Sequence, residues 1–137
     1  MTKLILEIEE DYDFHLIGIV AHVKDYRLSW ELNRNLNLDL FKDQDLEIKM
    51  KENSKSFSFH LYIDEDNSVE YYLLGNKSES GYLIPEESKC DYLFILKGNI
   101  ESEAVKEILK QLNSFKLILA CYSLEVEKLK SKKNLIF

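Results

Sequence analysis

The apolar residues of this chain change their spacing several times, and this change of period limits the folds that the chain can adopt. Apolar and polar side chains alternate in residues 46–51, 57–63 and 69–74, as is typical of strands with one buried face. In residues 103–113 the apolar side chains recur every three or four positions, which predicts a helix. A chain that mixes the two periods is expected to pack helices against a sheet.

The longest helical pattern extends from about residue 14 to residue 35. Leu16, Ile19, Val23, Arg27 and Trp30 follow one another at helical spacing, and a weaker apolar stripe lies on the other side. A helix that is apolar on two sides is expected to lie between layers or against another subunit. Arg27 and Trp30 therefore have two interpretations: a polar contact within the core, or anchors of a protein interface. Both interpretations remain open from the sequence.

Further strands are expected at residues 3–9, 91–97 and 115–124, which gives the order β-α-β-β-β-β-α-β. We therefore predict an α+β domain in which two helices cover a mostly antiparallel sheet as a two-layer sandwich. A ferredoxin-like topology is the first expectation for the strand order. We expect a single domain over residues 1–127, followed by a basic and apolar C-terminal tail over residues 128–137.

The charge balance of the chain narrows the class of partner. There are 18 Lys and Arg against 25 Asp and Glu, a net charge of −7, which disfavours a surface built throughout to bind phosphates. No export signal is visible, because acidic residues follow the first apolar residues at once. The longest uncharged apolar stretch, residues 16–23, is too short to cross a membrane. We expect a cytoplasmic protein that does not engage a membrane.

Metal and cofactor chemistry have little support in the sequence. The three histidines, His15, His22 and His60, lack the spacing of metal ligands, and the glycines are scattered outside any phosphate-binding loop. We assign no catalytic residue, no metal and no cofactor. Because His60 alternates out of phase with Phe57 and Phe59, we expect its side chain to face solvent or the edge of a layer.

The loop around the only proline, Pro85, offers the best candidates for chemistry. Glu86 or Glu87 could act with Asp91 as an acid–base pair, or these carboxylates could accept backbone N–H groups of the connection. Cys90 follows Lys89 and could be a reactive thiol, or a small apolar residue at the start of a buried strand. In both cases the residues favour the structural interpretation, as they do for Cys121 within an apolar run.

Residues 84–92 resemble the motif that names the IPExxxVDY family of Bacteroidetes proteins. Residues 25–28 and 130–137 also resemble that family, so the resemblance covers the whole chain. It implies a bacterial, cytoplasmic protein and no particular activity. The residues that match are Ile84, Pro85, Glu86, Asp91 and Tyr92, and Cys90 stands where the motif has Val.

Three functions follow as hypotheses. The first is a non-enzymatic interaction protein or accessory subunit, which could bind another protein or form a homodimer. The second is an accessory factor for RNA or ribosomes that contacts phosphates through Lys128, Lys130, Lys132 and Lys133. The third is a small-ligand binder or enzyme that uses Glu86, Asp91 and Tyr92. For the first hypothesis the interface candidates are Arg27, Trp30, Lys132, Lys133, Leu135, Ile136 and Phe137.

Overall fold

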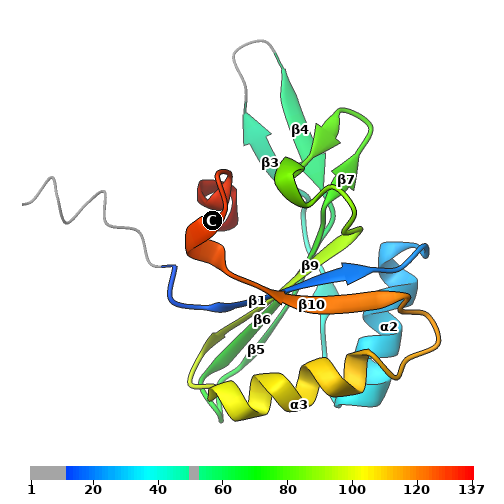
Figure 1. The fold of residues 1–137 in the computed structure, drawn as a ribbon, viewed down its shortest axis with the longest axis vertical. Coiled ribbons are helices and arrows are strands. Elements are labelled where there is room, and N and C mark those ends of the chain that lie inside the picture. The colour runs from blue at the N-terminus through cyan, green and yellow to red at the C-terminus, as the bar shows by residue number, and fades with distance from the viewer. Residues whose placement is uncertain (1–11, 50–52) are drawn as a thin grey trace, which may run out of the picture.

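The computed structural model describes residues 12–49 and 53–137 of the chain. A six-stranded sheet forms its centre, in the order β10-β1-β9-β6-β5-β2, and all neighbouring strands are antiparallel (Figure 1). The strands are β1 (His15–Val20), β2 (Phe41–Lys42), β5 (Phe59–Asp64), β6 (Val69–Gly75), β9 (Tyr92–Gly98) and β10 (Ala120–Leu124).

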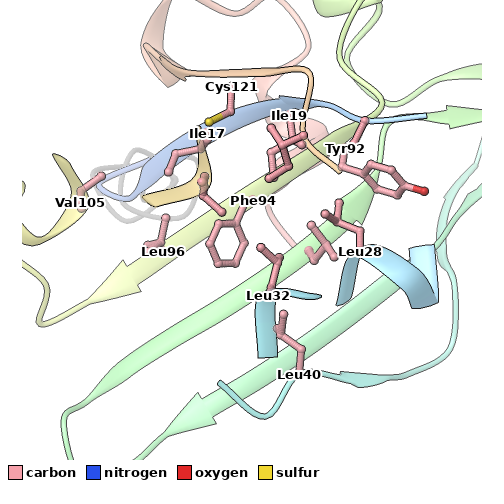
Figure 2. Close-up of a cluster of buried hydrophobic side chains, with 14 residues drawn as sticks. Ile17, Ile19, Leu28, Leu32, Leu40, Tyr92, Phe94, Leu96, Val105 and Cys121 are labelled. Atoms are coloured by element: carbon pink, nitrogen blue, oxygen red, sulfur yellow. The ribbon is translucent and has the colours of Figure 1, made fainter. Parts of the chain in front are cut away.

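Both helices cover the same face of this sheet. They are α2 (Asp25–Leu36) and α3 (Ser102–Leu112). Leu28 and Leu32 of α2 lie beside Phe94 of β9 in a cluster of buried side chains, and all three are fully buried (Figure 2). The prediction of an α+β fold with a mostly antiparallel sheet and two helices is confirmed.

The opposite face of the sheet carries a second layer without α-helices. Phe57, Leu83, Leu129 and Leu135 are buried there in a separate cluster that includes Leu93 of β9. Residues 128–137, which we expected as a tail, thus pack against the sheet. The elements of this layer are β3 (Leu46–Lys49), β4 (Ser54–Phe57), β7 (Lys77–Ser78), β8 (Gly81–Tyr82) and the 3-10 helices η1 (Pro85–Glu87), η2 (Val126–Lys128) and η3 (Lys132–Leu135).

The prediction of one long helix over residues 14–35 is wrong. Residues 15–20 form β1, and the helix begins only at Asp25. β1 pairs with β10 on one side and β9 on the other, so it lies inside the sheet. Ile17 and Ile19 point into the cluster under the helices, and Leu16 points into the other cluster. A strand buried on both faces lacks alternation, so its apolar run also fits a helical period.

Two further strand predictions concern residues 115–124 and residues 3–9. The strand predicted at residues 115–124 begins at Ala120, because residues 115–119 form a turn in which the Ile118 N–H donates to the Phe115 carbonyl. The strand predicted at residues 3–9 lies outside the described residues. Four strands follow the order β10-β1-β9-β6, and β5 and β2 extend the sheet beyond them. The ferredoxin-like ordering is therefore not confirmed.

Gly18 in β1 provides a test of this packing. A Cβ atom at this position would lie 2.6 Å from Cys90 Sγ and 3.1 Å from Leu124 Cδ1. We expect Gly18→Ala to lower the free energy of unfolding by about 1–3 kcal/mol in urea denaturation, because the central strand cannot move away. Cys90→Ala removes the sulfur, so the double variant should lose less than the sum of the two single losses. Strict additivity would contradict this description of the contact.

Candidate functional site

The loop over residues 84–92, which carries the motif, connects β8 to β9 and is tightly packed. Ile84 and Cys90 are fully buried. Pro85 occupies the start of η1, where a helix has no internal partner for an N–H group and proline is favoured. The Cys90 N–H donates to the Glu87 carbonyl and closes the loop. The motif residues therefore first define a compact connection between two strands.

Asn76, between β6 and β7, holds this loop together through hydrogen bonds of its side chain. Its side chain is fully buried, and its Oδ1 accepts the Ile84 N–H at 2.7 Å. Its Nδ2 donates to the carbonyls of Glu87 and Cys90, both at 2.9 Å. One amide thus satisfies three backbone groups that would otherwise be buried without partners. Sequence reasoning missed Asn76, because its only signal is a polar residue after a strand.

Asp91 holds the connection between β1 and α2. Its Oδ2 accepts the Ala21 N–H at 2.9 Å, and its Oδ1 lies 2.8 Å from Lys77 Nζ. The hydroxyl of the next residue, Tyr92, donates to the carbonyl of Val23, and burial raises the pKa of this phenol to about 12. Both side chains therefore fix the backbone that leads into α2. The N–H that Asp91 accepts belongs to Ala21, which follows β1, and not to the connection in which the sequence interpretation placed it.

Glu86 has the same kind of role at the other end of the loop. Its Oε2 accepts the Ser131 N–H at 2.7 Å, and its Oε1 accepts the Ser131 hydroxyl at 2.9 Å. Burial alone would raise the pKa of this carboxyl, but the hydrogen bonds from Ser131 hold it below its ordinary value of 4.5. Glu86 therefore anchors the C-terminal segment to the domain.

A cleft of about 520 Å³ lies where the loop meets the start of α2. Asp91 and Tyr92 line it together with Asp25, Lys77 and Ser58, but Glu86 does not. The three residues that we grouped as a possible pocket are thus not brought together. Asp25 Oδ2 lies 2.8 Å from Lys42 Nζ, so both carboxylates at this cleft are paired with lysines. Among the described residues, no group of three or more His, Cys, Asp or Glu could hold a metal ion.

The prediction that the His60 side chain faces solvent or the edge of a layer is wrong. Its side chain is 3% exposed and its Nε2 lies 3.7 Å from Asp25 Oδ2, beneath the first turn of α2. In β5, His60 lies on the side of the sheet that α2 covers, whereas Phe59, Leu61 and Ile63 lie on the opposite, less covered side, so the alternation was assigned to the wrong face. Burial lowers the pKa of His60, although the Asp25 carboxylate opposes this effect. Its Nδ1 has no hydrogen-bond partner in the described part of the chain.

The outer side of α2 carries four exposed residues, which we call the α2 stripe: Tyr26, Arg27, Trp30 and Arg34. Tyr26 is 66% exposed and Trp30 is 52% exposed. The Arg34 guanidinium lies 5.2 Å from the centre of the Trp30 ring. The interpretation of Arg27 and Trp30 as core residues is wrong, because Leu28, Ser29 and Leu32 form the buried side of the helix.

The C-terminal candidates separate into buried and exposed residues. Leu135 is buried, Ile136 is half-buried, and Phe137 is 52% exposed with its ring against those of Phe59 and Tyr72. Lys133 is exposed, whereas Lys132 Nζ lies 4.8 Å from the centre of the Tyr12 ring. Lys132, one of the basic residues of the C-terminal segment, therefore contacts another part of the same chain.

Neither cysteine has the surroundings of a reactive thiol. Burial raises the pKa of the Cys90 thiol, whose Sγ lies 3.2 Å from the Tyr122 hydroxyl. Burial also raises the pKa of Cys121 to about 11. A nucleophilic cysteine needs a stabilised thiolate and access to solvent. Both residues act as small buried side chains, as their sequence context indicates.

Comparisons with known proteins return no matching family model, no matching curated protein and no matching solved structure. The resemblance to the IPExxxVDY family therefore stays a prediction. In residues 12–49 and 53–137, no helix has the length and apolar character needed to cross a membrane. What the structure contributes is a physical role for each motif residue.

His60 gives a test by pH. Because its folded-state pKa lies below the ordinary value of 6.5, the unfolded chain binds the proton more readily, and this contribution to stability is lost as the pH falls below about 6.5. In urea denaturation between about pH 7 and pH 5, wild type should lose more stability than His60→Gln. Parallel profiles for wild type and His60→Gln would contradict the assignment.

Proposed function

We propose that this protein is a non-enzymatic interaction protein that binds an acidic surface of another protein through the α2 stripe. The observation that carries the proposal is the exposure of Tyr26 and Trp30, each more than half exposed, on a helix whose start is fixed by the motif residues. Trp, Tyr and Arg are the residue types most enriched where a few side chains dominate binding. The family resemblance and the cytoplasmic location remain parts of this proposal.

The engagement of the polar motif residues supports a binding role over catalysis. Asp91 accepts a backbone N–H and pairs with Lys77, and Glu86 accepts two hydrogen bonds from Ser131. A general base needs a carboxylate that can reach a proton of the substrate. Here the carboxylates hold the chain in place. The argument against a catalytic role is strongest for Asp91. This residue lines the cleft, yet its carboxylate already accepts a hydrogen bond from the Ala21 N–H.

The charges of the α2 stripe favour an acidic partner. Arg27 and Arg34 are both exposed, although the chain as a whole carries a net charge of −7. Complementary charges at an interface accelerate encounter and exclude partners of the same sign. Arg34 is already placed over the Trp30 ring, so less side-chain entropy is lost when a carboxylate binds it.

The RNA hypothesis has weaker support. Two of its four lysines are paired with carboxylates: Lys128 Nζ lies 3.2 Å from Glu125 Oε2, and Lys132 Nζ lies 3.8 Å from Glu127 Oε1. Both carboxylates reduce the positive field that a phosphate backbone would meet. We therefore keep RNA as an outcome of the test below.

The test is capture of partners from native lysate with the tagged protein, at low and high salt and with nuclease. Protein partners should survive nuclease, and Trp30→Ala or Arg27→Ala should reduce their recovery by at least about tenfold. Leu119→Ala is the matched control, because Leu119 is 62% exposed and lies outside the α2 stripe. Equal recovery with all variants would overturn the proposal. Loss of every partner on nuclease treatment would favour RNA.

A further inference from the structure

A groove of about 500 Å³ lies between the start of α3 and the turn that joins β5 to β6, and we call it the α3 groove. These two segments lie side by side at one end of the sheet (Figure 1). The floor of the groove is apolar, because Val69, Tyr71, Ile100 and Ile108 line it. The last three are half-buried and pack against the cluster beneath the helices. The groove therefore opens on the helix-covered face of the sheet.

Carboxylates stand on both walls of the α3 groove. Asp64 lines it from the turn, and the exposed Glu101 and Glu107 line it from α3. No lysine or arginine is among its lining residues. In the described part of the chain these three carboxylates belong to no ion pair, and Asp64 Oδ2 accepts a hydrogen bond from Asn67 Nδ2 at 2.9 Å. The negative charge of the walls is thus left without a cation from the chain itself.

The surroundings of the groove strengthen its negative field. Glu65 and Asp66, in the same turn, are both exposed. Lys106 of α3 does not line the groove, and its Nζ lies 3.5 Å from Glu103 Oε1. Burial raises the pKa of Tyr71, and the Asp64 carboxylate raises it further. The field of the wall therefore reaches the floor of the groove.

We infer that the α3 groove binds a basic segment of another protein, with an apolar side chain on the floor and lysine or arginine side chains against the walls. Surfaces of opposite charge attract each other and exclude partners of the wrong sign. A volume of this size accommodates a few side chains. In a two-fold contact between copies of this chain the three carboxylates would meet one another, which disfavours a second copy as the occupant.

This inference goes beyond the proposed function, because no residue of the α2 stripe lines the groove. The α2 stripe offers arginines to an acidic partner, whereas the α3 groove offers carboxylates to a basic one. The chain would then hold two partners of opposite charge at separate places.

The experiment is an NMR titration of the full chain with the amidated peptide Lys-Leu-Lys-Leu-Lys at about 50 mM salt. We expect a Kd below about 1 mM, with amide shift changes in residues 64–71 and 99–108. Glu101→Gln/Glu107→Gln should weaken binding by about fivefold or more, since two charge contacts are lost. Glu125→Gln/Glu127→Gln is the matched control: it removes two carboxylates that are 73% and 72% exposed and do not line the groove.

Peptide variants test the same site without changing the protein. With serine in place of leucine, binding should weaken by about fivefold or more, because the apolar floor is left unfilled. With glutamate in place of lysine, binding should be lost. Trp30→Ala should leave binding of the Lys-Leu peptide unchanged, so failure of this inference is distinguishable from failure of the proposed function.

Four results would overturn the inference. They are shift changes outside the groove only, equal losses in the two double variants, a serine peptide that binds as tightly as the leucine peptide, and a diamine such as putrescine that does so. The last would identify a site for a small organic cation. Sedimentation equilibrium of the free chain tests a second copy as the occupant, and a dimer that Glu101→Gln/Glu107→Gln dissociates would also contradict a basic partner segment.

Discussion

The hydrogen bond from the Ala21 N–H to the Asp91 carboxylate is the interaction on which the rest of the structure depends. Asp91 lies at the start of β9, in the middle of the sheet, where its own N–H donates to the Ile19 carbonyl at 2.8 Å. Its side chain thus joins the central strands to the backbone that leads from β1 into α2. Lys77 compensates the charge of this largely buried carboxylate at 2.8 Å.

The two carboxylates of the motif each hold a different segment of the chain in place. Asp91 and Tyr92 fix the segment that begins α2, and Glu86 fixes the segment that ends in Phe137. Helix α2 and the C-terminal segment lie on opposite faces of the sheet, yet residues of one loop hold both. This explains why the residues of the motif can be largely internal in their contacts while the proposed function lies on the surface.

Much of the fold could be predicted from hydrophobic periodicity. The helix over residues 102–112 buries one side, so its pattern carries the helical period. Alternation also placed the strands around residues 59–64 and 69–75, although Leu73 and Leu74 of the second strand are buried on opposite faces. β1 could not be recognised, because Ile17 and Leu16 are buried on opposite faces and its apolar run fits a helix equally well. The strand-like run before Ala120 was misjudged because its apolar residues serve a turn.

The candidate site was predictable only in part. A backbone-binding role for Glu86 and Asp91 could be predicted from carboxylates beside a proline, but their partners, Ser131 and Ala21, lie 45 and 70 residues away in the sequence. The roles of Asn76 and His60 depend on groups distant in sequence: Asn76 binds the loop that begins at Ile84, and His60 lies beneath Asp25. No local pattern encodes such contacts. The exposure of Arg27 and Trp30 likewise depended on where α2 begins, which the merged helix prediction had shifted.

The central claim, that the motif loop holds both α2 and the C-terminal segment in place, is tested most directly by amide hydrogen exchange in Asp91→Ala and Glu86→Ala. The account predicts that Asp91→Ala speeds exchange in α2 by about tenfold or more, while the central amides of β6 and β9 stay protected. Glu86→Ala should act in the same way on residues 131–135 and leave α2 unchanged. Wild-type protection of both segments in both variants would contradict the account.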